Sequence, residues 1–274
     1  MTDASVDPVT AVTPDQVAEA LARLRATTPL VQSLTNIVVA QWTANVLLAA
    51  GAAPAMVDNP HEAEAFARVA GGVLVNTGTP YDDTTAGMRA AVTGAQAAGT
   101  PWVLDPVAAG GLAWRTEVAV SLMDVHPPTI VRGNASEIAG LLGGLGGRGV
   151  DSADSPEEVL DRARELATSR GTVVAVSGAV DHLTDGERLV RVHNGDPVMT
   201  KVTGVGCALG ALMAGFAAGC DDALLAATSA TALLTVAAER AARASRGPGS
   251  FAVGLLDELS LVTPDELAGA LVLS

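Results

Sequence analysis

Short apolar segments alternate with longer helical segments along most of the chain, and this alternation constrains the fold more than any other feature. Each apolar segment has the length of a buried strand, and the segments between them are long enough to cross over to a parallel neighbour. The order predicts βαβ units, a mostly parallel sheet and helices on both faces, which is an α/β fold. The predicted strands are Leu30–Leu34, Ala55–Val57, Gly72–Asn76, Trp102–Asp105, Thr129–Arg132 and Thr172–Ser177.

Capping sequences mark the starts of the predicted helices. The run Thr13–Gln16 combines an N-cap threonine, a proline in the first turn and a glutamine that can complete a capping box. Similar starts occur at Asn59–Glu62, Asn134–Glu137, Ser155–Glu158 and Thr263–Glu266. Two long apolar helices are predicted near residues 206–219 and 221–243.

Residues 182–192 interrupt the βαβ pattern. Two short apolar runs flank Asp185-Gly186, which predicts an antiparallel hairpin with a type I′ turn at the edge of the sheet. No linker rich in proline, serine or charge divides the chain. We therefore expect a flexible leader over residues 1–12 and a single domain over residues 13–274.

Composition excludes several classes of function. The chain has 30 acidic and 16 basic residues, and its formal net charge of −14 argues against nucleic acid or an anionic membrane as a partner. The single lysine, Lys201, is not part of a Gly-Lys-Ser/Thr sequence, so a Walker A loop is absent. Two cysteines cannot form a disulfide scaffold or a four-cysteine zinc site.

The long uncharged stretches at residues 37–57 and 202–220 approach the length of a membrane span. They contain polar residues or several glycines and lack basic flanks, which favours buried helices. The first residues have no apolar segment of the signal-peptide kind, so we expect a cytoplasmic, reducing environment.

The strongest candidate for a functional site is the run from Thr203 to Cys207, Thr-Gly-Val-Gly-Cys, which precedes an apolar helix. The amides of Gly204, Val205, Gly206 and Cys207 can point into one concavity, and the helix N-terminus adds positive potential. This predicts an anion hole for a phosphate group. A glycine-rich turn into a buried helix fits the spacing equally well.

Other candidate residues lie where ligands bind in open parallel sheets, at the carboxyl ends of the strands. Asp105 ends a predicted strand before Pro106, which we expect to keep it extended and exposed, and Glu137 lies in the first turn of a helix. Two such carboxylates can hold Mg²⁺ against phosphates, although Glu137 also fits a purely capping role. Cys207 lies where a helix dipole favours the thiolate, or it is a small buried residue.

Arg132 and Ser177 complete the set of polar candidates. An arginine at a strand end can clamp a phosphate group, and a serine before a glycine can donate to one. A surface arginine and a turn serine are the alternative interpretations. Met56 is more often a core residue than a ligand contact.

Six segments in this order make the chain similar to hydroxyethylthiazole kinases, which have the ribokinase-like fold. The likeness covers about residues 14 to 262, and Cys207 stands where most ribokinase-like enzymes have an aspartate base. The segments are PLVQSLTN (29–36), APAMVD (53–58), VLDPVAAG (103–110), VRGNASEI (131–138), AVSGAVD (175–181) and TGVGCALGA (203–211).

The resemblance implies an enzyme that uses Mg²⁺ and ATP to phosphorylate the hydroxyl group of 4-methyl-5-(2-hydroxyethyl)thiazole, a step of thiamine salvage. It also implies homotrimers with active sites between subunits, so that Met56 serves a neighbour's site. The matching positions are Asn36, Met56 and Gly204 for the substrate, Arg132 and Ser177 for ATP, Asp105 and Glu137 for the metal, and Cys207 for catalysis.

Val205 and Ala108 depart from the family pattern, and we expect their methyl groups to narrow the approach of the phosphate. Three alternatives stay open at this point. The chain is a ribokinase-like kinase for another small alcohol, an ATP-dependent dehydratase of nicotinamide hydrates, or a non-catalytic thiazole-binding protein.

Overall fold

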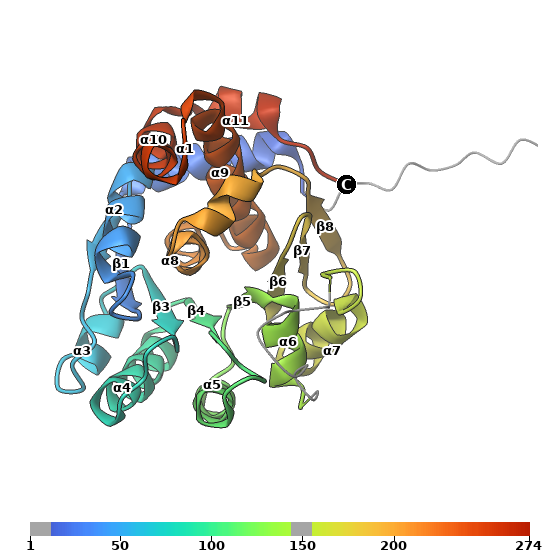
Figure 1. Cartoon of the computed structure of the whole chain (residues 1–274). Helices are drawn as coiled ribbons and strands as arrows, with labels where there is room; N and C mark the ends of the chain where they lie inside the picture. The colour runs from blue at the N-terminus through green and yellow to red at the C-terminus, as the bar shows by residue number, and fades with distance from the viewer. Residues whose placement is uncertain (1–11, 144–154) are drawn as a thin grey trace, which may run out of the picture.

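The computed structural model describes residues 12–143 and 155–274, so residues 1–11 of the predicted leader lie outside the described residues (Figure 1). Within the described part, eight strands form one sheet in the order β2-β1-β3-β4-β5-β6-β7-β8. β1 to β6 are parallel, and β7 runs antiparallel to β6 and β8. The strands are β1 (Leu30–Leu34), β2 (Ala53–Ala55), β3 (Gly72–Asn76), β4 (Trp102–Asp105), β5 (Ile130–Asn134), β6 (Val173–Ser177), β7 (Asp181–Thr184) and β8 (Leu189–Val192).

Helices cover both faces of the sheet, as the alternation predicts (Figure 1). Leu74 packs with one helix layer, while Val73 and Val75 pack with the other, so the central strand β3 is buried on both faces. The first layer contains α1 (Pro14–Thr27), α2 (Ala40–Ala50), α8 (Val205–Ala217), α9 (Ala223–Ala244), α10 (Pro248–Leu261) and α11 (Pro264–Ala270). The second contains α3 (Ala63–Ala67), α4 (Asp82–Ala98), α5 (Ala113–Val125), α6 (Ala135–Leu141) and α7 (Leu160–Arg170).

The predicted capping boxes begin helices α1, α6 and α11. Two other helices begin later than their capping sequences suggest. The side chain of Asn59 accepts the amide of His61 at 2.9 Å in a turn before α3, and the capping bonds between Ser155 and Glu158 close a turn before α7. Side-chain hydrogen bonds of asparagine and serine stabilise turns as well as helix starts, which explains the shift.

β2 ends two residues before its predicted end at Val57. A side chain from β1 explains the difference, because Gln32 donates from Nε2 to the carbonyl oxygen of Val57 at 2.8 Å. The backbone of Val57 is therefore paired with a side chain rather than with the neighbouring strand. Register pairing of β2 with β1 stops at Ala55.

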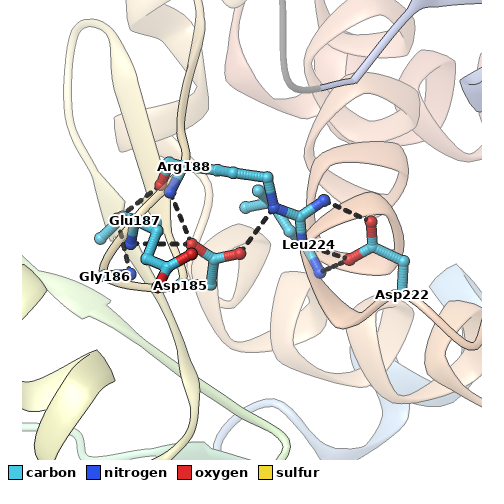
Figure 2. Close-up of polar contacts among 7 residues, drawn as sticks. Asp185, Gly186, Glu187, Arg188, Asp222 and Leu224 are labelled. Atoms are coloured by element: carbon cyan, nitrogen blue, oxygen red, sulfur yellow. Dashed lines mark hydrogen bonds and ion pairs between the residues drawn. The ribbon is translucent and has the colours of Figure 1, made fainter.

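The predicted hairpin is present, but its type I′ turn is wrong. Thr184 pairs with Leu189, so the loop has four residues, and of these only Gly186 has a left-handed φ, at 101°. A type I′ turn needs two such residues. Figure 2 shows what stabilises the longer loop: Asp185 accepts the amide of Arg188, whose guanidinium makes a bidentate pair with Asp222, the N-cap of α9, at 2.7 and 3.0 Å.

Helix α8 runs antiparallel to the strands of the sheet. Near its C-terminal end, Ala214 lies so close to Gly72, at the start of β3, that a Cβ there would overlap the carbonyl group. Its N-terminal end therefore lies at the carboxyl edge of the sheet. Neither of the two long uncharged stretches, residues 37–57 and 202–220, forms a membrane span. In the described part of the chain no helix is long and apolar enough to cross a membrane.

Candidate active site

Polar side chains from five adjacent strands meet at the carboxyl edge of the sheet. Asn36 follows β1, Asn76 ends β3 and Asp105 ends β4, while Arg132 lies in β5 and Ser177 ends β6. Cys207 reaches the same edge from the first turn of α8. The structure thus brings together most of the predicted site residues.

A continuous chain of polar contacts links these side chains. Asn36 donates from Nδ2 to Sγ of Cys207 at 3.5 Å and to Oδ1 of Asn76 at 3.0 Å. Asn76 donates from Nδ2 to Oδ2 of Asp105 at 2.7 Å. The same Asp105 oxygen lies 3.5 Å from Nη1 of Arg132. The chain extends across the site, from the predicted acceptor side to the predicted ATP side.

The N-terminus of α8 has free backbone donors. Ala208 is the first residue whose amide bonds back to Gly204, at 2.9 Å, and no side chain caps the helix. The amides of residues 205–207 therefore have no acceptor within the helix. Gly204 itself has a left-handed φ of 94°, and a Cβ there would lie 2.7 Å from Cγ1 of Val39, so glycine is required.

Val205 does not narrow this site, contrary to the sequence-based expectation. Its side chain is 4% exposed and packs in the core cluster that α8 shares with the sheet. The branched residue is accommodated because it faces the protein interior.

Arg132 places a charged guanidinium beside the free amides. A Cβ on Gly206 would lie 2.9 Å from Nη2 of Arg132, and that nitrogen donates to Oγ of Ser177 at 3.1 Å. Burial opposes the positive charge, but Asp105 and Glu137 outweigh it, and the pKa of Arg132 is raised. A fixed cation next to a helix N-terminus favours binding of an anion such as phosphate.

Asp105 is fully buried, so the prediction that it is exposed at the edge is wrong. Helix α8 covers the carboxyl group: a Cβ on Gly210 would lie 3.8 Å from Oδ2 of Asp105, in ordinary van der Waals contact. Burial raises the pKa of Asp105 to about 7, with Arg132 acting in the opposite direction and Glu137 adding to the rise. Its Oδ1 atom has no partner among the described residues.

Of the two interpretations of Cys207, the raised pKa of the thiol argues against the thiolate. Burial raises the pKa of the thiol, and the nearby Asp105 raises it further, while Arg132 and the two asparagine side chains lower it. Desolvation and a neighbouring carboxyl group therefore both act against the thiolate.

Glu137 forms the capping box of α6 and also holds the loop after β4. Its Oε2 accepts the amide of Asn134 at 2.8 Å, and its Oε1 accepts the amide of Ala108 at 3.0 Å. Ala108 has a left-handed φ of 64°, where glycine is the favoured residue. An alanine in place of the family's glycine at position 108 therefore strains the backbone. The metal-binding role of Glu137 stays a prediction.

Met56 is not part of the polar chain. It follows β2 and is 38% exposed, and the neighbouring strand end carries Ile37 and Val38, which are 78% and 68% exposed. Exposed apolar residues thus follow the first two strands of the sheet.

Two residues received no role from the sequence. Asn76 occupies the centre of the polar chain and is fully buried. Asp181 begins β7 and accepts the amide of Gly178 at 3.0 Å, and burial raises its pKa to about 6. For Asn76 the available signal was an amide residue at the end of an otherwise apolar strand.

The chain has the ribokinase-like α/β fold. The chain belongs to the hydroxyethylthiazole kinase family, whose model matches residues 21–265. It is 58% identical to a hydroxyethylthiazole kinase of Cutibacterium acnes, over 92% of this chain and 91% of that protein. It is 60% identical to a hydroxyethylthiazole kinase of Clavibacter sepedonicus, with the same coverage of each.

Solved structures agree with this assignment. A hydroxyethylthiazole kinase protein from Pyrococcus horikoshii matches with a TM-score of 0.87 and 38% identity, covering 94% of this chain and 98% of that one. Pyridoxal kinase from Staphylococcus aureus matches with a TM-score of 0.58 at 17% identity, covering 77% of this chain and 87% of that one. The second match shows the fold alone.

Proposed function

We propose that this protein transfers the γ-phosphoryl group of ATP to the primary hydroxyl group of 4-methyl-5-(2-hydroxyethyl)thiazole, a step of thiamine salvage. The observation that carries the proposal is the N-terminus of α8, where the free amides lie beside the guanidinium of Arg132. Membership of the hydroxyethylthiazole kinase family supports the choice of substrate.

The proposed roles divide the site into two sides. Asn36, Met56 and Gly204 contact the thiazole alcohol, while Arg132 and Ser177 bind ATP. The amides of residues 204–207 hold the phosphoryl group during transfer. Phosphoryl transfer depends mainly on positioning and charge stabilisation, which this arrangement provides.

Asp105 and Glu137 are the residues proposed to hold Mg²⁺. The described residues contain no group of three acidic, histidine or cysteine side chains that could hold a metal ion alone. An incomplete set nevertheless fits Mg²⁺, which commonly uses one or two carboxylates together with phosphates and water, and Oδ1 of Asp105 is an unpartnered buried oxygen. When bound, the ion supplies positive charge to the phosphate oxygens.

Cys207 is proposed to face the acceptor hydroxyl group. Because burial raises the pKa of its thiol, we expect it to contribute little as a base. Its contact with Asn36 instead supports a role in orienting the acceptor.

The test is to incubate the protein with Mg-ATP and a panel of small alcohols and to identify products by mass. A phosphate monoester of hydroxyethylthiazole is expected. A monoester of another alcohol would redirect the proposal to that substrate. Release of phosphate in the presence of a nicotinamide hydrate, with no phosphorylated product, would indicate the dehydratase. Binding of the thiazole without turnover of ATP would indicate a non-catalytic binding protein.

We also propose a cytoplasmic homotrimer with active sites between subunits, in which Met56 serves a neighbour's site. The exposed Ile37, Val38 and Met56 at the carboxyl edge support such an interface, because a second copy would cover them. Light scattering is expected to give three times the chain mass, and Val38→Asp to lower it. A wild-type mass equal to that of a single chain would contradict the proposed trimer.

A further inference from the structure

We propose that Asn76 is a positioning residue that couples the acceptor side of the site to its phosphoryl side. This inference rests on the proposed function, because it concerns residues assigned to the substrate and to the metal. Among the described residues, the side-chain hydrogen bonds of Asn76 run to Asn36, Asp105 and the amide of Gly78, and it has none with Arg132. It acts through Asn36 and Asp105.

The hydrogen bonds fix the orientation of the Asn76 amide. Two donors converge on its Oδ1: the backbone amide of Gly78 and Nδ2 of Asn36, both at 3.0 Å. Only an oxygen can accept both bonds. The nitrogen must therefore face Asp105, to which it donates at 2.7 Å.

The backbone around Asn76 leaves this side chain little freedom. β3 lies between β1 and β4, and the register pairs Asn76 directly with Asp105. A Cβ on Gly78 would lie within 2.9 Å of the side chains of Asn36 and Asn76, so the turn after the strand closes on the amide. A fully buried amide held from three directions is a rigid support.

Each partner of Asn76 makes a second contact, with a residue that we propose faces the acceptor or binds ATP. Asn36 also bonds to Cys207, and Asp105 also pairs with Arg132. Because Nδ2 of Asn76 occupies Oδ2 of Asp105, Oδ1 is the oxygen left without a partner. Asn76 thus selects which carboxyl oxygen is available to a ligand, and it fixes the direction of the Asn36 amide.

The experiment compares Asn76→Ala and Asn76→Asp with the wild type. Loss of the support is expected to lower kcat by about 100-fold while the KM for ATP changes less than about threefold, since displacement of reacting groups by an ångström costs about that factor. Asn76→Asp keeps the shape and the Oδ1 acceptor but removes the donor to Asp105. It therefore remains informative where the alanine variant does not fold.

Asn194→Ala is the matched control. Asn194 is likewise buried, with two side-chain donations and one accepted amide, but its partners are Glu239, Ala270 and Val272. Its loss is expected to lower the melting temperature and to leave kcat near the wild-type value. If Asn76→Ala and Asn194→Ala both lose activity only in proportion to their folded fraction, the positioning role of Asn76 is refuted.

A double-variant cycle tests the coupling itself. If Asn76 acts through Asn36, the variant Asn36→Ala/Asn76→Ala is expected to lose about as much kcat as the poorer single variant. Losses that multiply would mean independent roles and would overturn the inference. Failure of the proposed function is distinguishable, because the wild type would then form no thiazole phosphate.

Discussion

Gly206→Ala tests whether the guanidinium of Arg132 must lie against the N-terminus of α8. Gly206 is the second residue of this helix and has no left-handed φ, so alanine suits its backbone. The added Cβ would lie 2.9 Å from Nη2 and 3.1 Å from Nη1 of Arg132. Relief of this overlap requires the guanidinium to move by roughly 0.5 Å, because carbon and nitrogen atoms in van der Waals contact lie about 3.5 Å apart.

Such a shift changes the site more than the fold. The bond from Nη2 to Ser177 is already 3.1 Å long, so a shift of this size away from Ser177 takes it beyond hydrogen-bond range. Loss of one preorganised donor to a phosphoryl group costs about 3–4 kcal/mol, or about 10²–10³ in kcat. Alanine in a helix is favoured over glycine by up to ~1 kcal/mol, so we expect little loss of stability.

The assay measures kcat, the KM for ATP and urea unfolding of Gly206→Ala beside Gly249→Ala. Gly249 is the second residue of α10, and a Cβ there meets no atom within 4 Å. The control is expected to gain stability slightly and to keep full activity. If Gly206→Ala keeps kcat/KM for ATP within about threefold of the wild type, the placement of Arg132 is not needed for catalysis.

Four further predictions follow from the site. Cys207→Ser is expected to keep kcat within about tenfold, since the pKa of the thiol is raised; a loss of 10³ or more would restore Cys207 as the base. Glu137→Gln leaves one of the two backbone amides that Glu137 binds without an acceptor, so the free energy of unfolding should fall by about 1–3 kcal/mol. The KM for Mg-ATP should rise. The control variant Glu266→Gln, which changes another capping box, should leave that KM unchanged. Burial raises the pKa of Asp181 to about 6, so the folded chain binds this proton more tightly than the unfolded chain, and stability falls as pH rises from about 4 to 6. Asp181→Asn should therefore raise the urea midpoint at pH 8 more than at pH 4. An equal rise at both pH values would contradict this. Ala108→Gly should raise the free energy of unfolding by about 0.5–1 kcal/mol, because it relieves a left-handed alanine, and a lower urea midpoint would contradict the strain.

The parts of the fold that depend on local pattern could be predicted from the sequence. The alternation of apolar and helical segments predicted the parallel sheet and both helix layers, because the central strands are buried on two faces. The capping box of Asn134 and Glu137 was equally local. The position of the site followed from the rule that ligands bind at the carboxyl ends of parallel strands.

The parts that depend on tertiary contacts could not be predicted. Asp105 is buried because α8, about a hundred residues later in the chain, covers it. The sign of the pKa shift at Cys207 depends on the burial of the thiol itself and on the nearby Asp105. The end of β2 depends on a side-chain bond from Gln32, and the longer hairpin loop depends on Asp222. No local pattern contains these partners.

The charges around Arg132 bear on how the proposed Mg²⁺ would assist the binding of ATP. Three carboxyl groups, Asp105, Glu137 and Asp181, each raise the pKa of this guanidinium, so one positive charge is shared among several acidic groups. Partial protonation of Asp105, whose pKa is about 7, reduces the negative charge but does not reverse it. The free amides of α8 and Arg132 can therefore hold one phosphoryl group, but the remaining charge of ATP meets carboxylates. If Asp105 and Glu137 hold Mg²⁺ as proposed, the ion would supply positive charge at this site, and the acidic residues that would repel ATP alone would favour the Mg-ATP complex.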